Sequence, residues 1–578
     1  MTMPPSIGRG MPAPAPRPGP SKAKPLPAPS VQQTAILEHV QSMQVGDQAG
    51  VVAAAGSGKT TTIRMVDGAV RRLGWSLSVY AFNKHIQLEM QSHGLESSTM
   101  HSVGWRLLNA RAPHLAPDFQ AGGLKNYAFE LTPAESASGL SSRDLVSVFN
   151  EARLAGMIPM GFPGHGVCGL QADRLEHWAK VFGRTGRRKV LVLAKDPQSP
   201  RAKVAAGEVT EMLIRSLQLA GRCDYTDQIY RAVAYQWAPA SAPDVVAVDE
   251  FQDITPLDSA LVQLVGGRSR LLVVGDPSQA IYGFRGTSPE HFNRVVAKGA
   301  RLPLTVTRRC CRAVVDFVRA GGFEDIIARD DAPEGAVRTR VFDAAVDRAE
   351  WVGREAVPGD LVICRSNGEL LAVSAELIAL GTPVEVKLGD GGESPGQSFK
   401  KFFGVFDGAA PESYWPMRDR WMDDAEGRLR ALMAAGKDED AEELADAGEM
   451  LELIEATVRK SRAADLNSDS LSTVAAAVTK LFQTRTTKDR VRISTIHRAK
   501  GLEPADGRTV FWLTKYPHDV MDAETGLRRV DPSRECEEDR VSYVAATRAK
   551  DLLYIAHLSG YGGGRGRLMQ MFQALQAS

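Results

Sequence analysis

The chain has 578 residues, of which 43% are hydrophobic and 24% charged, and its formal net charge is +1. A chain of this length exceeds what one hydrophobic core usually holds, so we expect two large domains with insertions. The balanced charge argues against a polycationic coat for nucleic acid, although it leaves room for a basic groove. No apolar run approaches the roughly 20 residues of a membrane-spanning helix, and no signal-peptide core opens the chain. The six cysteines form no C-x-x-C pair, which argues against a zinc or iron–sulfur site and favours a reducing, cytoplasmic location.

Residues 1–29 differ in composition from the rest of the chain. Pro, Ala and Gly dominate them, several basic residues occur, and acidic residues are absent. Such a segment buries too little apolar surface to fold, so we expect a disordered or polyproline arm. A passive tail is the simpler interpretation, and contact with nucleic acid or a protein partner is the alternative.

A Gly-rich turn follows the first apolar strand, which is predicted at residues 51–53. Gly56 and Gly58 let successive backbone N–H groups face one anion, and a helix starting near Lys59 adds its positive end. Lys59 suits contact with the β and γ phosphates of a nucleoside triphosphate, and the Thr60 hydroxyl suits ligation of Mg²⁺. An alanine replaces the usual first glycine of this pattern, so an ordinary strand-to-helix turn is the alternative.

Two acidic residues follow another apolar strand, predicted at residues 245–248. Asp249 at the strand end suits a Mg²⁺ ligand, and Glu250 suits a base that activates an attacking water. The alternative is two carboxylates on an exposed strand end, which fits poorly with four apolar residues running straight into the pair. The phosphate loop and the acids together predict hydrolysis of ATP with Mg²⁺.

Further apolar strands are predicted at residues 271–274, 304–306, 361–364, 509–513 and 552–556. Unbroken apolar strands that alternate with helices indicate parallel sheets covered on both faces. Functional groups that cluster at strand ends are what an open α/β sheet provides. The fold class is therefore α/β.

The motifs occur in one order along residues 30–557, and they resemble those of superfamily 1 DNA helicases of the UvrD, Rep and PcrA type, most nearly the F-box DNA helicase branch. Besides the phosphate loop and the acidic pair, the resemblance rests on segments 80–84, 99–102, 275–286, 304–310, 493–503 and 543–549. It implies two RecA-like P-loop NTPase domains, each a parallel sheet flanked by helices and each with a mainly helical insertion.

The resemblance also divides the chain. The implied parts, after the arm at 1–29, are motor domain 1 at 30–107 and 225–305, a helical insertion at 108–224, motor domain 2 at 306–391 and 489–578, and a reduced insertion at 392–488. The second insertion contains a helical pattern at 438–461. The first contains a basic run at 184–189, for which contact with duplex DNA and a solvated loop are both open.

For the nucleotide, the resemblance assigns catalytic roles to Lys59, Glu250, Gln279, Arg309 and Arg548. Gln279 would sense the γ-phosphate, and the two arginines would neutralise charge in the transition state; register favours Arg309 over Arg308. The adenine edge would be read by Gln33 or its neighbour Gln32. The other implied nucleotide contacts are Ala55, Gly56, Ser57, Gly58, Thr60, Thr61 and Glu503, with Thr60 and Asp249 also holding Mg²⁺.

For DNA, the resemblance implies single-strand contacts from Phe82, Asn83, Thr99, His101, Tyr282, Phe284, Arg285, Thr495 and His497. Tyr282 and Phe284 stand two apart on an extended segment, so both side chains would share one face, as a base-stacking platform requires. Core packing is the alternative for these two aromatics. Phe82 stands one place nearer the Asn-Lys pair than the stacking phenylalanine of the UvrD branch, which weakens its match. His101 and His497 would otherwise be ordinary hydrogen-bonded histidines.

These implications predict an ATP-dependent DNA helicase that moves 3′ to 5′ on single-stranded DNA, acts at junctions of single and double strands, and works as a monomer. The chief alternative is a single-strand translocase that removes bound proteins such as recombinase filaments. An ATP-switched scaffold and an RNA substrate are further alternatives, because fold alone does not decide function. Only a short stretch follows His557, so we expect no nuclease domain there.

Overall fold

The computed structural model describes residues 26–82, 84–112, 128–185, 187–218, 223–283, 287, 289–365, 367–386, 490–514, 519–521, 528–530 and 535–558, with short pieces between 414 and 478. Nearly all of the predicted N-terminal arm and most of the predicted insertion at 392–488, including most of its helical pattern, lie outside the described residues. Within them, no helix has the length and apolar character that crossing a membrane requires. All six cysteines are free thiols.

The first sheet has six parallel strands in the order β3-β2-β4-β5-β1-β6. In that order the strands are Ser97–Thr99, Leu77–Ala81, Val245–Val248, Arg270–Gly275, Gln48–Ala53 and Ala300–Leu304. The predicted strands at 51–53, 245–248 and 271–274 are therefore confirmed, as is their parallel arrangement.

Both faces of the first sheet are buried, which explains its unbroken apolar strands. Alternate residues of β4 point to opposite sides: Val245 and Ala247 pack in one core cluster, and Val246 and Val248 in another. The first cluster includes α1 (Val31–Ser42), α2 (Lys59–Arg72) and α3 (Lys84–Ser92). The second includes α4 (Met100–Arg111), α11 (Pro256–Gly266) and α12 (Pro289–Lys298).

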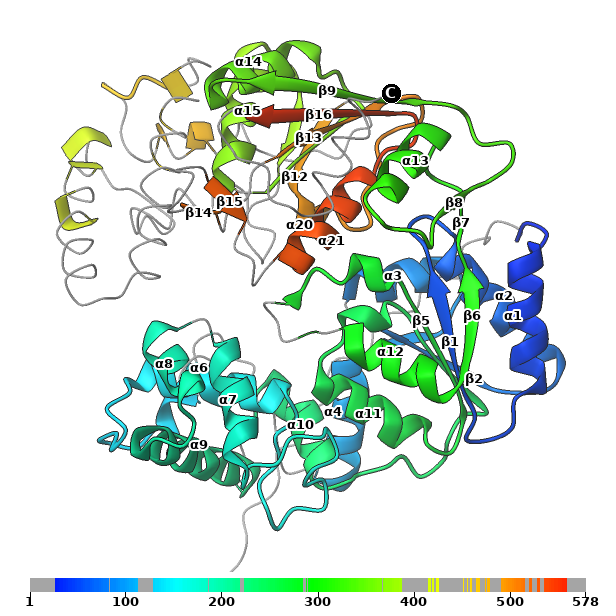
Figure 1. Cartoon of the computed structure of the whole chain (residues 1–578), viewed down its shortest axis with the longest axis vertical. Helices are drawn as coiled ribbons and strands as arrows, with labels where there is room; N and C mark the ends of the chain where they lie inside the picture. Colours follow the sequence, from blue (N-terminus) through cyan, green and yellow to red (C-terminus); the bar gives the residue numbers. More distant parts are fainter. Residues whose placement is uncertain are drawn as a thin grey trace, which may run out of the picture.

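A group of helices extends the second of these clusters away from the sheet (Figure 1). The group consists of α6 (Ser142–Leu154), α7 (Leu175–Arg184), α8 (Arg188–Lys195), α9 (Pro200–Gln218) and α10 (Tyr225–Ala234). Buried Arg153 of α6 pairs with Asp224 at 2.7 Å and with Asp227 at 3.0 Å, which fixes α6 against the start of α10. The basic run at 184–189 joins α7 to α8, and Arg187 within it pairs with Asp144 at 3.3 Å.

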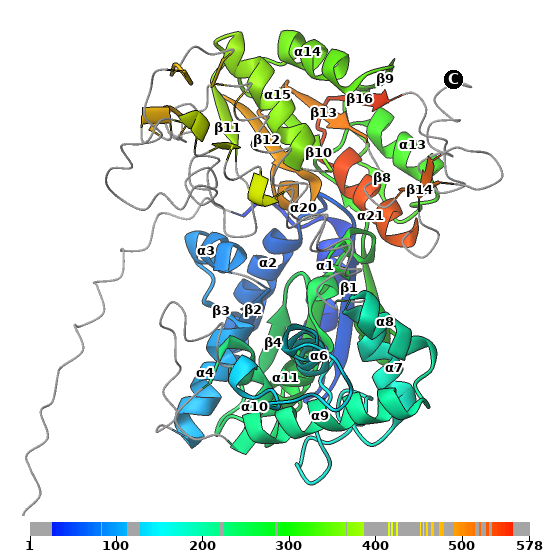
Figure 2. The ribbon, with the colours of Figure 1, turned by 90° about the vertical axis from the view of Figure 1, so that its left-hand side faces the viewer.

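The second sheet also has six parallel strands, in the order β11-β12-β10-β13-β16-β9. In that order they are Val384–Val386, Val491–Thr495, Leu361–Cys364, Thr509–Leu513, Leu552–Leu558 and Ala336–Phe342. The strands predicted at 361–364, 509–513 and 552–556 are confirmed. The fold class is thus α/β with two parallel sheets, one above the other in Figures 1 and 2.

Helices cover both faces of the second sheet as well. One core cluster contains α14 (Ala345–Glu355) and α15 (Asn367–Ala379). The opposite cluster contains α13 (Arg312–Ala320), α20 (Ile496–Ala499) and α21 (Glu535–Ala546). This opposite cluster also takes in Ala54, Ala55 and Ile281 from the first sheet's loops. The two halves therefore share a continuous apolar contact. Two short strands outside the sheets, β14 (Asp519–Met521) and β15 (Arg528–Val530), pair antiparallel with each other.

The prediction of one strand at 304–306 is wrong. β6 ends at Leu304, and Val306 begins a separate strand, β7 (Val306–Thr307), which pairs with β8 (Ile327–Ala328). The break falls at Thr305, whose N–H donates to the Gln32 side chain at 3.0 Å instead of to a neighbouring strand. The chain leaves the first sheet at this residue and turns towards the second.

Candidate active site

A cavity of about 1120 Å³ lies between the two sheets, at the carboxyl ends of several of their strands. Most of the predicted site residues line it: Gly56, Ser57, Gly58, Lys59, Thr60, Thr61, Phe82, Asp249, Glu250, Gln279, Tyr282, Arg309, His497, Glu503 and Arg548. Six others, Gln32, Gln33, Ala55, Thr99, His101 and Thr495, are not part of its lining. The predicted DNA contacts Asn83, Phe284 and Arg285 lie outside the described residues.

The phosphate loop joins β1 to α2 at one wall of this cavity. Gly56 and Gly58 have φ angles of 70° and 91°, a left-handed conformation that glycine adopts without strain. Gly58 caps α2 and lines the cavity, so the positive end of this helix faces the cavity. The first turn of α2 contains no acidic residue that would neutralise this end. The Ser57 hydroxyl is buried and has no hydrogen-bond partner among the described residues. An unsatisfied buried hydroxyl in such a loop fits a phosphate ligand.

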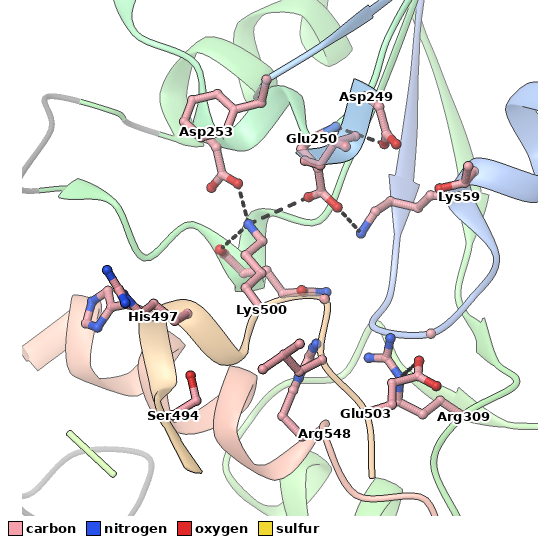
Figure 3. Close-up of a pocket in the computed structure, with 18 of the residues that line it drawn as sticks. Lys59, Asp249, Glu250, Asp253, Arg309, Ser494, His497, Lys500, Glu503 and Arg548 are labelled. Atoms are coloured by element: carbon pink, nitrogen blue, oxygen red, sulfur yellow. Dashed lines mark hydrogen bonds and ion pairs between the residues drawn. The ribbon is translucent and has the colours of Figure 1, made fainter. Parts of the chain in front are cut away.

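Glu250 lies opposite the loop, immediately after β4. It is one of two non-glycine residues of the described chain with a positive φ, at 51°. Lys59 Nζ lies 3.2 Å from one of its carboxylate oxygens and Lys500 Nζ 3.6 Å from the other (Figure 3). Burial alone would raise the pKa of Glu250, but the two lysines outweigh it and hold the pKa at about 2. The carboxylate is therefore ionised at neutral pH, as a base for water must be.

Asp249 directly follows the last residue of β4 and is 2% exposed. Its Oδ1 accepts a hydrogen bond from the backbone N–H of Glu250 at 2.9 Å, which orients the carboxylate at the strand end. Within the described ranges, no group of three or more His, Cys, Asp or Glu side chains is arranged to hold a metal ion. Mg²⁺ commonly takes one or two protein oxygens and completes its shell with phosphate oxygens and water, and Asp249 with Thr60 fits that donor set.

Two arginines approach the same cavity from the side of the second sheet. Arg309 Nε donates to Glu503 at 2.6 Å, and its guanidinium also donates to the Thr547 carbonyl at 3.3 Å. Arg548, in the turn after α21, is 1% exposed and donates to the Val544 carbonyl at 3.0 Å. Burial and the charge of Arg309 lower the pKa of Arg548, although a guanidinium stays charged at neutral pH.

Lys500 is a site residue to which the sequence assigned no role. Its ammonium contacts Glu250, forms an ion pair with Asp253, and donates to the Gln279 carbonyl at 3.1 Å (Figure 3). Asp253 ends the turn η1 (Phe251–Asp253). Burial raises the pKa of Asp253 to about 6 in spite of Lys500. Lys500 falls within segment 493–503, on which the family resemblance rests, but the resemblance gave it no role and no interaction partner.

Gln279 ends a second short turn, η2 (Pro277–Gln279), and is 4% exposed. Its side-chain amide donates to Asp276 Oδ2 at 2.6 Å. Burial raises the pKa of Asp276. Asp276 was not predicted as a site residue, although it orients one that was.

Gln32 and Gln33 use both ends of their amide groups within the protein. Gln33, which is 1% exposed, accepts from the Ser30 N–H at 3.0 Å and donates to the Thr62 hydroxyl at 3.0 Å. Gln32 donates to the Thr305 hydroxyl at 2.9 Å and accepts from the Thr305 N–H at 3.0 Å. The present bonds therefore tie both side chains to the protein. Reading of an adenine edge would require further bonds to Gln32 or Gln33, or release of the present ones.

An aromatic group from three separate segments lies at the other side of the cavity. The rings of Phe82 and Tyr282 are 6.0 Å apart and nearly parallel, at 26°. The Tyr282 hydroxyl donates to the His497 carbonyl at 3.0 Å, and the His497 ring lies 6.3 Å from the Tyr282 ring. The structure thus brings together Phe82, whose match was weak, and two residues with stronger matches.

The remaining predicted DNA contacts lie elsewhere. Thr99 caps the N-terminus of α4, where its hydroxyl accepts from the Ser102 N–H at 3.2 Å. His101 is exposed, and its ring meets Tyr225 edge-on at 6.1 Å. Tyr225 is itself 53% exposed and was not predicted as a site residue. Thr495 ends β12 and is the N-cap of the short helix α20.

Two parallel α/β halves, a phosphate loop facing a carboxylate pair, and arginines approaching from the opposite half define a P-loop nucleoside triphosphatase with two RecA-like domains. Family comparisons make the assignment narrower. The AAA domain family matches residues 32–285, and the UvrD-like helicase C-terminal domain family matches residues 418–560. Together, the two matches support a UvrD-like superfamily 1 helicase. These matches do not show that the chain belongs to the F-box branch, so that branch stays a prediction.

Individual relatives agree with the family. The chain is 26% identical over 272 residues to DNA helicase II of Salmonella typhimurium, and 25% identical over the same length to that of Escherichia coli. Both alignments cover 42% of this chain and 33% of the relative. The RecBCD enzyme subunit RecB of Mycolicibacterium smegmatis is 34% identical over 155 residues, which cover 23% of this chain and 14% of that subunit. The chain thus matches a third or less of the length of these relatives.

Proposed function

We propose that this chain is an ATP-driven motor that moves 3′ to 5′ along single-stranded DNA and separates the strands of a duplex at a junction. The observation that supports this best is the meeting of Lys59, Glu250, Arg309 and Arg548 in one cavity between two parallel sheets. These residues come from distant parts of the chain, and together they match the needs of phosphoryl transfer to water.

In the proposed reaction, Lys59 and the backbone N–H groups of the phosphate loop bind the triphosphate of ATP. Bound Mg²⁺ supplies charge neutralisation at the phosphoryl group, and Thr60 and Asp249 would hold it. The triphosphate takes over Lys59 from its ion pair with Glu250, which leaves one carboxylate oxygen, Oε1, free to accept a proton from the attacking water, while Lys500 stays at Oε2. Arg309 and Arg548 neutralise the charge that develops on the transferred group.

DNA binding is proposed at the aromatic group of Phe82, Tyr282 and His497. Rings that face a cavity offer stacking surfaces for bases without regard to sequence. The exposed pair His101 and Tyr225 is proposed as a second contact on the first domain. Tyr282 stands three residues after Gln279, so one short segment connects the nucleotide with the DNA. Closure and opening of the cavity during the ATP cycle would move the two grips relative to each other.

The division of the chain belongs to the same proposal. Motor domain 1 would comprise 30–107 and 225–305, motor domain 2 would comprise 306–391 and 489–578, and the insertions would lie at 108–224 and 392–488. We further propose that the motor works as a monomer in the cytoplasm, at junctions of single-stranded and duplex DNA.

The test is strand separation on two matched duplexes, one with a 3′ single-stranded tail and one with a 5′ tail, with and without ATP and Mg²⁺. Separation of the 3′-tailed duplex alone would support the proposal, and separation of the 5′-tailed duplex alone would overturn the direction. If neither duplex opens while single strands stimulate ATP hydrolysis, the motor is a translocase. A chain without any DNA-stimulated hydrolysis would overturn the function. Lys59→Ala serves as the inactive control in each arm.

A further inference from the structure

α21 docks against the segment that links the nucleotide to the DNA. Arg540 Nε of this helix donates to the Ala280 carbonyl at 2.6 Å. One turn further, Val541, Tyr543 and Val544 share a core cluster with Ile281 and with the start of the phosphate loop. Figure 2 shows α21 at the level where the two sheets meet. The helix that precedes Arg548 is thus in direct contact with residues 276–281.

The hydroxyl of Tyr543 is the polar centre of this contact. It accepts a hydrogen bond from the backbone N–H of Ala55 at 3.2 Å, and it lies 3.4 Å from Asp276 Oδ2, to which it donates. Tyr543 is 2% exposed, Asp276 is 2% exposed, and Ala55 is fully buried. The ring packs against Phe323 at a centroid distance of 4.6 Å, which fixes the direction of the hydroxyl.

Asp276 Oδ2 connects this hydroxyl to the γ-phosphate sensor. The same oxygen accepts from the Gln279 amide at 2.6 Å, and Oδ1 accepts from the Ser278 N–H at 3.0 Å. A displacement of α21 would lengthen or break the hydrogen bond from the Tyr543 hydroxyl to Oδ2. The strength of the hydrogen bond from Gln279 to the same oxygen would then change. The Tyr543 hydroxyl, on the helix that precedes Arg548, therefore contacts both the phosphate loop and the aspartate that holds Gln279.

We propose that Tyr543 is a positioning residue whose hydroxyl couples the placement of Arg548 to that of Gln279 and the phosphate loop. Tyr543 is not part of the lining of the cavity between the sheets; it acts through Asp276 and Ala55. The inference rests on the proposed function, because it names the residue through which DNA bound near Tyr282 would accelerate hydrolysis.

The first test is Tyr543→Phe, which removes one oxygen and keeps the ring against Phe323. The expected result is a fall of about tenfold in the DNA-stimulated kcat, within the range of typical coupling effects, while KM for ATP and the Kd for a single strand without nucleotide stay within about twofold. Tyr554→Phe is the matched control, because its hydroxyl is also hydrogen-bonded, to Arg338 at 2.9 Å, but on the far side of the second sheet. An unchanged kcat, or an equal loss in the Tyr554 variant, would overturn the inference.

A double-mutant cycle with Asp276→Asn tests the route of the effect. If the hydroxyl acts through Asp276, the double variant loses no more kcat than Asp276→Asn alone, whereas additive losses would contradict the proposal. Should Tyr543→Phe fail to fold, Asp276→Asn is compared with the wild type by the same split of kcat against KM, and a loss confined to KM would overturn the inference. The wild type separates the two proposals: if it shows no DNA-stimulated hydrolysis, the proposed function fails first, and if it hydrolyses ATP while the variants behave normally, only the coupling role fails.

Discussion

The two walls of the cavity differ in charge. In the lining from the first half, Asp249, Glu250 and Asp253 are balanced by Lys59, Arg64 and Lys84, whereas cations outnumber acids in the lining from the second half, which includes Lys500 and Arg548. Lys500 joins the two walls, because its ammonium contacts both Glu250 and Asp253. A triphosphate would compete for the cations and release the acids, so charge exchange is a physical way for the nucleotide to change the contact between the walls.

The two acids also differ from each other, although both contact Lys500. Glu250 lies between two lysines and has a pKa of about 2, while Asp253 has one cation and a pKa of about 6. Desolvation is opposed by two charges in the first case and largely by one in the second. The comparison indicates that the acid nearest the phosphate loop is kept ionised and that its neighbour has a structural role. Four variants test the roles assigned to residues of the two walls, in order of expected effect.

The largest effect is expected from the cations that face the phosphates. Arg309→Ala should lower kcat for ATP hydrolysis by about 10³-fold or more, because an arginine that neutralises transition-state charge has that typical value. Steady-state hydrolysis with saturating single-stranded DNA measures it. Arg308→Ala is the matched control: Arg308 is exposed and adjacent, and its replacement should change kcat little. Equal losses in both variants would show that the register of the arginine is wrong.

Glu250→Gln should lower kcat by about 10²–10⁴-fold, the usual contribution of a general base. Binding of ATP, followed with a fluorescent analogue, should persist because Lys59 and the phosphate loop are unchanged. Glu211→Gln on the exposed face of α9 is the control for loss of one carboxylate. Retained turnover in the Glu250 variant would contradict the assignment of the base.

Tyr282→Ala should weaken binding of a single strand by about 1–3 kcal/mol, the value of one stacked base. Fluorescence anisotropy with a labelled oligonucleotide measures the change. Tyr282→Phe keeps the ring and loses only the hydrogen bond to the His497 carbonyl, so most of the affinity should remain. If both variants bind like the wild type, the aromatic group is a packing feature of the interface.

The smallest effect concerns pH. Because the folded pKa of Asp253 is about 6 and the ordinary value is near 3.9, the folded chain holds the extra proton between these values. This group therefore makes the free energy of unfolding fall as pH rises from about 4 to about 6. Asp253→Asn should remove that contribution, which comparison of urea unfolding at the two pH values detects. Asp196→Asn, on an exposed loop, should leave the slope unchanged.

The sequence predicted those strands that are unbroken apolar runs buried on both faces. The interior strands β2 and β12 were not predicted, since polar residues such as Ser78 and Arg492 interrupt their apolar pattern. The edge strand β9 was also missed, because its Arg338, Thr339 and Arg340 are exposed. The strand at 304–306 was placed across a break that depends on Gln32, a residue far away in sequence. Hydrophobic periodicity and composition describe local burial, and they contain no information on hydrogen bonds between residues far apart in sequence.

The site shows the same limit. Motifs predicted the residues that would meet ATP, and the cavity contains most of them. Motifs did not predict that Lys500 pairs with Asp253, 247 positions earlier, or that Tyr543 contacts the phosphate loop from the other half. For Gln32 and Gln33 the pattern named a function, and only the fold revealed that internal bonds already occupy both amides. Pairing between halves of the molecule is a property of the assembled fold.

Gly56 has a consequence for how the two halves of the molecule are joined. A Cβ at this position would stand 2.5 Å from the Cβ of Arg309, and the Gly56 carbonyl accepts from the Arg308 N–H at 2.9 Å. The missing side chain sets the spacing between the phosphate loop and the backbone that carries Arg309. The backbone of Arg309 therefore packs directly on the phosphate loop, while its guanidinium is bonded to Glu503 and to the Thr547 carbonyl in the second half. This one residue thus joins the two halves across the cavity, and any side chain at position 56 would push its backbone away from the loop.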